Sequence, residues 1–539
     1  MKKIKNHALS TMVMITLLFI LASCNNNDKP IEPKTNETQV ETTTTTQSDN
    51  MNNALSEDDK KIIDTVIDNF MPLTQVPRPS HHEEKISEYL YNWAKDAGFN
   101  PEKDKVNNIM FNVPATSGME DKPLGILQGH MDMVVAVADG KTFDPQNDPI
   151  TAIRNDQDMT LTADGTSLGT DDGVGVSMIL SVAQGKMAHG PLRMIITVDE
   201  EDGMYGAFNI SKSWFDGASY LINIDSETSD EVLVSTAAGD GIVATKKVSF
   251  SNATLNKSLS ITILNLKGGH SGVEIDKGRL NGIIGLANLL KKFDDENISY
   301  ELSSFEGGTA ANAIPMKANA SIMVKDEDVE TIKNKILEYE KELNDKYKGI
   351  EENIKIEVSE TGEVSQVVSK DEKDNFVKFI TEIINGVYTM SKDMDGLVES
   401  SSNLGIAKLN NDGVYLNVYN RSSSADKETE INDSQISLAK VCGYEVETSK
   451  MAEPWKFDPN SSLLELCKEV YKNQNGEDIK VVALHAGLEC GCFKKMNPDL
   501  DMISIGPDLT DVHSIKETLH LKTVPRTWKL LEGILKEYK

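Results

Sequence analysis

Leu124-Gly125-Ile126-Leu127-Gln128-Gly129-His130 is a short apolar run that ends in polar residues. The same pattern returns at Leu192 to Val198, which ends in Asp199-Glu200-Glu201, and at Tyr220 to Ile224, which ends in Asp225. Apolar runs of this length, alternating with helical segments, predict buried strands of an α/β sheet. Open α/β sheets place their sites just past the strand ends, so the sequence predicts a functional site at these polar residues.

Side chains of the kind that bind metals recur in five segments spread along the chain. They are His130 and Asp132, Asp171, Glu200 and Glu201, Asp225, and His513. Imidazole and carboxylate ligands suit zinc or another divalent first-row metal. One shared carboxylate can bridge two ions, which together polarise a carbonyl and activate a water. Each residue alone is a weak signal, whereas their recurrence at successive strand ends is a stronger one.

Adjacent residues within this set allow a division of labour. Of the pair Glu200 and Glu201, one can bind metal while the other stays free as a general base. An aspartate two residues after a histidine, as Asp132 is after His130, can hydrogen-bond the far ring nitrogen and set the tautomer.

The pattern of the sequence changes after about Ala238. Strands are expected at Ser258 to Leu264 and Ala318 to Val324, and a helix at Gly278 to Phe293, and a similar order returns from Ile354 to Val418. From Met451 the composition again resembles the first part. We therefore predict a discontinuous catalytic domain with an inserted α+β lid of two related halves. The predicted boundaries are 55–238 and 447–539 for the catalytic domain and 239–446 for the lid.

The N-terminal residues predict an export signal rather than part of the fold. Lysines are followed by an apolar run from Met12 to Ala22, and small residues precede Cys24. This order is typical of a bacterial lipoprotein signal over residues 1–23, with a lipid attached to Cys24. Residues 24–54 predict a disordered tether because they contain almost nothing apolar. We expect an extracytoplasmic protein anchored to the bacterial membrane; an ordinary secretory signal is the alternative.

Composition excludes some classes of protein. There are 85 acidic and 55 basic side chains, which gives a net charge of −30 and argues against nucleic-acid binding. Five cysteines are too few for a disulfide scaffold. Cys490 and Cys492 are expected to be small buried thiols rather than a third metal site, because soft-ligand partners are missing.

Several longer motifs resemble one family. They are Pro77-Arg78-Pro79-Ser80, GILQGHMDMV around His130, LGTDDGVG around Asp171, TVDEEDGMYGA around Glu200, LINIDSE around Asp225, KGGHSGVEI around His270, Asn312-Ala313-Ile314-Pro315, HAGLECG from His485 and GPDLTDVHS around His513. Over residues 55–539 the chain resembles the aminoacyl-histidine dipeptidases, also called Xaa-His or beta-alanyl-histidine dipeptidases of the bacterial carnosinase type. These belong to the co-catalytic di-zinc exopeptidases.

The resemblance implies a role for each matching residue. It places His130, Asp171 and Asp225 on one ion, and Asp171, Glu201 and His513 on the other, with Asp171 as the bridge. It makes Glu200 the general base, Asp132 the residue that orients His130, His270 and Asn312 the oxyanion-binding pair, and Arg421 the holder of the substrate carboxylate. The two ions would be zinc, with cobalt or manganese also compatible. His485 either contacts substrate or is a hydrogen-bonded core histidine.

The sequence departs from the family pattern near the site. Asp172 stands where the family usually has Asn, Ala310, Ala311 and Met316 surround Asn312 where relatives often carry basic residues, and Ser514-Ile515-Lys516 follows His513. These changes spare the ligands but leave substrate preference open.

The expected function is hydrolysis of dipeptides, Xaa-His above all, by a metal-activated water with a Glu general base. The alternatives are a broader di- or tripeptidase, an N-acyl amino acid amidohydrolase, and a non-catalytic peptide-binding lipoprotein. Homodimerisation is left open.

Overall fold

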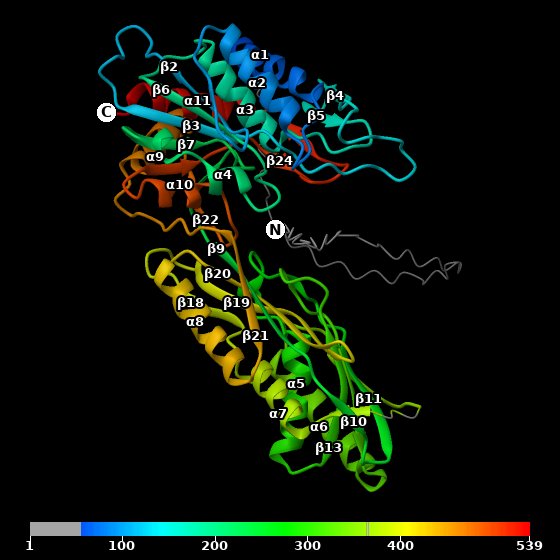
Figure 1. Ribbon diagram of the computed structural model, residues 1–539. Helices are drawn as coiled ribbons and strands as arrows, with labels where there is room; N and C mark the ends of the chain where they lie inside the picture. Colours follow the sequence, from blue (N-terminus) through cyan, green and yellow to red (C-terminus); the bar gives the residue numbers. More distant parts are fainter. Residues whose placement is uncertain (1–54, 363, 365) are drawn as a thin grey trace, which may run out of the picture. The chain divides into compact units, whose positions relative to one another are not determined.

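The computed structural model in Figure 1 describes residues 55–362, 364 and 366–539. The predictions of a signal peptide, a lipidated Cys24 and a tether lie outside these residues. Among the helices that the structure describes, none is long and apolar enough to cross a membrane.

The first sheet carries the predicted strands. Its order is β1-β2-β6-β3-β7-β23-β8-β22. The bounds are β1 (Glu102–Lys103), β2 (Ile109–Val113), β3 (Leu124–His130), β6 (Leu192–Thr197), β7 (Ala218–Asn223), β8 (Glu231–Thr236), β22 (Lys480–Leu484) and β23 (Asp501–Ser504). Strand β3 pairs in parallel with both β6 and β7. Their carboxyl ends therefore meet at one edge of the sheet, as the apolar runs predicted.

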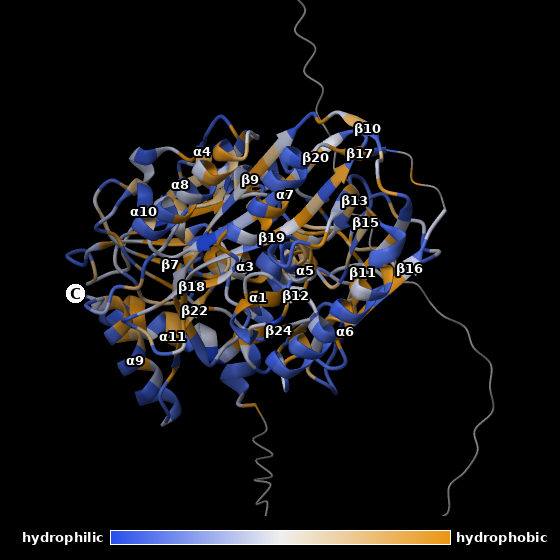
Figure 2. Ribbon diagram, turned by 90° about the horizontal axis from the view of Figure 1, so that it is seen from below, coloured by the Kyte–Doolittle hydropathy of each residue, from blue (hydrophilic) through white to orange (hydrophobic). Residues whose placement is uncertain are grey.

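Helices from both ends of the chain pack against this sheet. They are α1 (Glu57–Thr74), α2 (Glu84–Asp96), α3 (Thr170–Ala183), α4 (Tyr205–Asn209), the 3-10 helix η1 (Lys212–Phe215), α9 (Ser462–Asn475), α10 (Cys490–Met496) and α11 (Val524–Glu537). Ser56 caps α1 through a capping box with Asp59. In Figure 1 the C-terminal helices (orange to red) lie beside strands β3, β6 and β7 (cyan to green). One apolar core joins these segments, and α9 and α11 show both apolar and polar colours in Figure 2.

The second sheet forms the lid. Its order is β16-β11-β15-β13-β19-β20-β9-β21, with β18 paired to β19. The strands are β9 (Ala238–Lys246), β11 (Lys257–Leu264), β13 (Tyr300–Gly307), β15 (Ala318–Val324), β16 (Lys355–Glu360), β18 (Gly386–Met390), β19 (Val398–Asn410), β20 (Gly413–Ser422) and β21 (Glu445–Ala452). Its helices are η2 (Ile275–Lys277), α5 (Gly282–Asp295), η3 (Asp326–Asp328), α6 (Val329–Lys346), α7 (Lys370–Glu382) and α8 (Ala425–Val441).

The lid is an insertion, because in the chain it stands between β8 and β22 of the first sheet. The predicted α/β catalytic domain with an inserted lid domain is thereby confirmed. Strand β16, expected to open the second half of the lid, pairs instead with β11. The relatedness of the two halves and the domain boundaries stay predictions.

Short strands complete the fold. A four-stranded sheet has the order β24-β25-β5-β4. Its strands are β4 (Ala152–Asn155), β5 (Thr160–Ala163), β24 (Leu509–Thr510) and β25 (Thr518–His520), and two ribbons join β10 (Phe250–Asn252) to β17 (Gln366–Val368) and β12 (Gly269–His270) to β14 (Ala313–Ile314). The connection between β24 and β25 carries His513. Since β25 pairs with β5, the small sheet brings the C-terminal segment to the part of the chain that leads into α3.

Candidate metal centre

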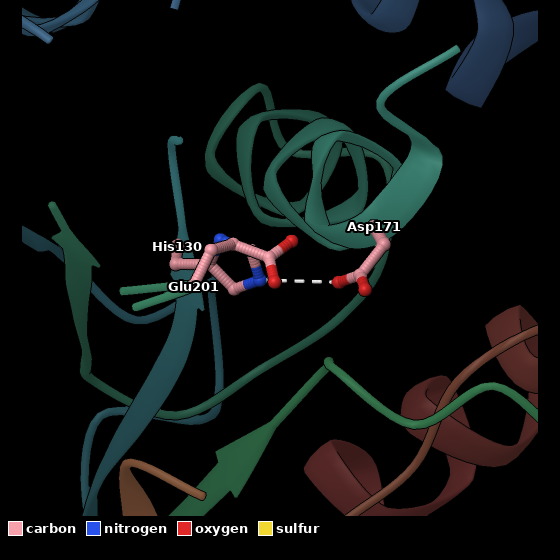
Figure 3. Close-up of side chains that lie close together, drawn as sticks. All are labelled: His130, Asp171 and Glu201. Atoms are coloured by element: carbon pink, nitrogen blue, oxygen red, sulfur yellow. Dashed lines mark hydrogen bonds and ion pairs between the residues drawn. The ribbon is translucent and has the colours of Figure 1, made fainter. Parts of the chain in front are cut away.

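The carboxylate of Asp171 lies between two imidazoles that come from opposite ends of the chain. His130, the last residue of β3, places Nε2 at 3.1 Å from Asp171 Oδ1. His513 places Nε2 at 3.0 Å from Asp171 Oδ2, and also at 2.9 Å from Glu201 Oε2. Figure 3 shows His130, Asp171 and Glu201 pointing toward one another, and their ligand atoms all lie within 4.8 Å of each other. This is the arrangement expected of a carboxylate that bridges two cations.

Asp225 completes the cluster of candidate metal ligands, and its buried carboxylate requires a nearby positive charge. Its Oδ1 lies 3.5 Å from His130 Nε2, while its buried Oδ2 has no hydrogen-bond partner among the described residues. Burial raises the pKa of Asp225 to about 7. Asp171, Glu200 and Glu201 crowd the same site, and isolated buried carboxylates are costly. Oxygen and imidazole donors converging on such a site fit a pair of divalent cations.

Asp132 orients the group from its position two residues after His130. It is fully buried, and its Oδ1 lies 3.2 Å from His130 Nδ1. The same carboxylate accepts the backbone N–H of Glu200 at 3.1 Å and of Glu201 at 3.2 Å. Because Nδ1 of His130 faces this carboxylate, Nε2 is the nitrogen left to face the metals. The structure thus brings Asp132 where the sequence predicted it.

Glu200 lies in the same cavity as Asp171, Glu201 and Asp225. Burial raises the pKa of Glu200 well above its usual range. Its neighbour Glu201 contacts His513, whereas no described side chain forms an ion pair with Glu200. A carboxylate without such a partner beside the ligand set is suited to proton transfer.

The predicted substrate residues His270 and Arg421 of the lid meet the His485 segment around Gly272. A Cβ there would lie 2.9 Å from Cε1 of His270, 3.1 Å from Nε of Arg421 and 2.6 Å from the backbone oxygen of His485. Arg421 is buried over the ring of Tyr419, and its Nε has no partner among the described residues. A buried guanidinium with a free donor is suited to bind a carboxylate.

The two histidines near Gly272, His270 of the lid and His485 after β22, differ in which nitrogen is free. Nδ1 of His270 accepts the backbone N–H of Gly272 and of Val273, each at 3.3 Å, which leaves Nε2 as its N–H donor. Burial and the nearby Arg421 lower the pKa of His270, which disfavours the charged ring. His485 is buried, and its Nε2 lies 2.7 Å from Ser401 Oγ, while Nδ1 has no described partner. Burial lowers the pKa of His485 to about 3. Both predicted interpretations of His485 therefore remain open.

Asn312 is exposed, and its backbone oxygen accepts the N–H of Ser271 at 2.8 Å beside the β12–β14 ribbon. Within the described residues, no hydrogen bond or ion pair joins His270, Asn312 or Arg421 of the lid to the candidate metal ligands. Cys490 and Cys492 are buried free thiols, as expected, and lie outside the clusters of ligand atoms found in the described part.

Two buried charged residues that hold the site were missed as functional. Glu517 accepts backbone N–H groups of Leu168 at 2.8 Å, Gly169 at 3.0 Å and Thr170 at 2.6 Å, just before Asp171. Arg78 donates to the backbone oxygens of Met131 and Asp132 at 3.0 Å, and to that of Gly169. Their partners are backbone atoms, so no side-chain pattern predicts these contacts. The motif Pro77-Arg78-Pro79-Ser80 was the signal for Arg78, and Glu517 had none.

Asp172, which stands where the family usually has Asn, accepts hydrogen bonds from two backbone N–H groups. Its Oδ2 accepts the N–H of His130 and its Oδ1 that of Gly175, both at 3.1 Å. A Cβ at Gly129 would lie 2.1 Å from Asp172 Oδ2 and one at Gly175 would lie 2.2 Å from Oδ1, so glycine is required at both positions. The Asp172 carboxylate therefore fixes the end of β3 against α3.

Comparisons with known proteins agree with this geometry. Residues 126–537 match the family described as Peptidase family M20/M25/M40. The chain is 34% identical over 476 residues to the cytosol non-specific dipeptidase of Escherichia coli K12, covering 87% of this chain and 96% of the relative. The crystal structure of aminoacylhistidine dipeptidase from Vibrio alginolyticus superposes with a TM-score of 0.83 at 31% identity, covering 88% and 96%. A tripeptidase from Staphylococcus aureus shares the fold alone, with a TM-score of 0.50 and 15% identity over 88% and 98%.

Proposed function

Because the chain belongs to peptidase family M20/M25/M40, we propose that it is a metal-dependent dipeptidase of the aminoacyl-histidine type. The observation that carries this proposal is the Asp171 carboxylate held between His130 and His513, with Glu200 beside it. The relatives named as dipeptidases match 87–88% of the chain, including both parts of the catalytic domain.

The ligand set divides into two around Asp171. His130 and Asp225 lie on the Oδ1 side and Glu201 and His513 on the Oδ2 side, with Asp171 shared. Two zinc ions in these positions would polarise the scissile carbonyl and lower the pKa of a water molecule. The donors are nitrogen and oxygen, which cobalt and manganese also accept, so metal analysis of the purified protein identifies the pair.

The chain's own residues supply the proton transfer and the binding. Glu200 accepts a proton from the attacking water and passes it to the leaving amine. Asp132 is a positioning residue, because it fixes the ring of His130 and the backbone of Glu200. Nε2–H of His270, together with Asn312, donates to the oxyanion; the support for His270 is that its Nδ1 already accepts a backbone N–H. Arg421 binds the carboxylate of the second residue, with His485 beside it.

A dipeptide panel tests the proposal and its alternatives. We expect the zinc-loaded protein to hydrolyse beta-alanyl-histidine, Leu-His and Gly-His, and a chelator to abolish the activity. Equal rates on Gly-Gly and a tripeptide would show the broader specificity that the name of the Escherichia coli relative carries. Cleavage of only an N-acetyl amino acid would mean an amidohydrolase. Two bound metals with no turnover of any substrate would leave a peptide-binding lipoprotein.

We also propose that the enzyme works outside the cytoplasm, attached through a lipid on Cys24. The support is the order of lysines, apolar run and small residues before this cysteine. Mass spectrometry of the mature N-terminus tests it, and Cys24→Ala should release the protein from the membrane fraction. Cys24 unmodified in a cytosolic protein would contradict it.

We expect one chain to suffice for catalysis, because His270 and Arg421 of its lid already meet the His485 segment of the same chain. Sedimentation of active enzyme checks this. Activity confined to a dimer fraction would contradict it.

A further inference from the structure

The segment that leads into α2 lies beside the chain just after β3, and it carries a histidine that the proposed mechanism does not use. Oγ of Ser80 donates to Oδ2 of Asp132 at 2.9 Å. His81 is the next residue, and its φ of 67° is in the left-handed region. Its backbone N–H donates to Oε1 of Glu83 at 2.9 Å, which fixes the turn that carries the imidazole.

The imidazole of His81 joins two carboxylates of the connection after β6. Nδ1 lies 3.0 Å from Asp199 Oδ2, and Nε2 lies 2.7 Å from Asp202 Oδ2. These two aspartates stand immediately before and after the pair Glu200 and Glu201. The ring therefore spans the connection that carries the proposed general base and a proposed metal ligand. These two contacts are called the His81 bridge below.

Two carboxylate contacts require a proton on each ring nitrogen. A neutral imidazole has one donor and one acceptor, so one of its nitrogens would turn a lone pair toward a carboxylate oxygen. The hydrogen bond with Asp202 raises the pKa of His81, and the charge of Asp199 acts in the same direction against the opposing effect of burial. The geometry thus favours the imidazolium form of His81.

Three buried carboxylates beside His81 add to the need for positive charge. Glu83, Asp132 and Asp199 are all buried, and they offer ligand atoms within 4.8 Å of one another. Among the described residues, no Lys or Arg forms an ion pair with any of these three; their ion pairs are with His81 and His130. A positive charge on His81 therefore lowers the cost of burying this acidic group.

The pair Glu200 and Glu201 is held from two sides. On the buried side, Asp132 accepts their backbone N–H groups at 3.1 and 3.2 Å. On the exposed side, His81 binds the aspartates that flank them. Asp199 has a φ of 56°, a conformation that few residues other than glycine adopt and that persists only with support from its surroundings. The His81 bridge supplies such support next to Glu200.

We propose that His81 is a positioning residue for the reaction, because its imidazolium binds Asp199 and Asp202 together and thereby holds Glu200 in place for proton transfer. The catalytic consequence rests on the proposed dipeptidase function, whereas the bridge itself does not. Without the bridge the connection gains freedom, so Glu200 spends less time in the productive position. The lid residues proposed to bind the substrate are not part of the bridge, so substrate binding is expected to survive its loss.

His81→Asn tests this role with little risk to the fold, since asparagine is among the residues best tolerated at positive φ. Its amide offers one donor nitrogen in place of two. We expect kcat of the zinc-loaded variant on Leu-His to fall about tenfold with KM unchanged, because small displacements of a catalytic group are costly. The matched control is His82→Asn, an exposed neighbour whose Nε2 faces Gln146, and it should keep the parent kcat. An equal fall in both variants overturns the assignment.

A double-mutant cycle identifies the partners of His81. Asp202→Ala removes the exposed partner and should lower kcat less than His81→Asn does, because Asp199 still binds the ring. The double variant should lose no more than His81→Asn alone, since both changes break the same bridge. Losses that multiply would show that His81 acts through other contacts and would overturn the proposal.

Hydrogen exchange separates this inference from the proposed function, because it needs no turnover. In the zinc-loaded protein, a peptide that covers residues 199–204 should exchange faster in His81→Asn than in the parent, whereas α9 and α11 should exchange equally in both. Equal exchange of the 199–204 peptide overturns the bridge, whatever the activity. Turnover of no dipeptide by the parent protein contradicts the dipeptidase proposal, and faster exchange in the variant would still support the bridge.

Discussion

Nε2 of Gln128 donates a hydrogen bond of 2.6 Å to Oε2 of Glu489, and the two residues are 361 positions apart in the chain. The same oxygen accepts the hydroxyl of Thr197 at 2.7 Å. Gln128 lies on β3 two residues before His130, and Thr197 ends β6 shortly before Glu200. Glu489 therefore joins the ends of the two strands that present the metal group, and it is fully buried. The side-chain contacts of Glu489 thus lie within the sheet.

The first prediction concerns the pH dependence contributed by Glu489. Burial raises its pKa from 4.5 to about 8, so the folded protein keeps a proton that the unfolded chain has lost between these values. Stability contributed by this group is full below pH 4.5 and is lost as the pH rises toward 8, by at most about 1.4 kcal/mol per pH unit. Glu489→Gln keeps an acceptor and cannot ionise. Between pH 6 and pH 8.5, thermal melts should show a smaller loss of stability for Glu489→Gln than for the parent protein. Equal losses of stability would contradict the raised pKa of Glu489.

Glu517→Gln should loosen the segment before Asp171. The carboxylate accepts four consecutive backbone N–H groups, from Leu168 to Asp171, and the hydroxyl of Thr170. An amide turns one acceptor into a donor facing these donors. We expect a loss of about 1–3 kcal/mol in unfolding free energy and weaker metal retention on dialysis. Denaturant melts measure the first and metal analysis the second. Glu537→Gln, at an exposed position of α11, is the control and should change neither.

Glu200 and Glu201 should respond differently to the same substitution. Glu200→Gln should lower kcat about 10²–10⁴-fold with two metals still bound, because only the proton acceptor is lost. Glu201→Gln should lose metal, since Glu201 contacts His513. Kinetics and metal content of the two variants check the assignment. Metal loss in the Glu200 variant would make Glu200 a ligand instead.

Gly272→Ala should impair substrate binding rather than chemistry. The added methyl would lie 2.6 Å from a backbone oxygen and about 3 Å from His270 and Arg421, so these side chains must shift. We expect a rise in KM of about tenfold or more, with metal content unchanged. Gly476→Ala is the steric control, because an added Cβ there meets no atom within 4 Å. Its positive φ lowers stability on its own account, so the stability of this variant is measured as well. An unchanged KM for Gly272→Ala would argue against a shared binding function of this group.

Metal removal should destabilise the fold. Without cations the four carboxylates of the site repel one another, and Asp225 keeps an unpartnered buried oxygen. Saturating zinc at about 100 times its dissociation constant should add about 2.7 kcal/mol to the unfolding free energy. Melting curves with chelator and with restored zinc measure the difference. Identical curves would place the metals elsewhere.

Much of this site was predictable because its side chains follow strands whose apolar runs are visible in the sequence. His130, Glu200 and Asp225 each stand at a strand end, and parallel pairing of β3 with β6 and β7 converts that pattern into proximity. The fold class is confirmed by the two sheets, and the family resemblance by the match of residues 126–537 to the family.

The remaining features depend on contacts between distant segments. Glu517 and Arg78 bind backbone atoms. Because every residue type has these atoms, the sequence does not predict which of them will be bound. The convergence on Gly272 needs the lid and the His485 segment to meet, and no local pattern encodes that approach. Strand β16 pairs with β11 through a register set in three dimensions, so its place in the first half of the lid was not predictable.

The order of the first sheet has a consequence for synthesis. Strand β23 lies between β7 and β8, and His513 follows it, so a growing chain already contains every other proposed metal ligand long before the last gap in the sheet is filled. Until residues 501–504 emerge from the ribosome, β7 and β8 leave unpaired edges, which favour association between nascent chains. A polypeptide that ends before residue 501 would therefore be an aggregation-prone fragment rather than a peptidase, and translation must pass residue 513 before activity appears.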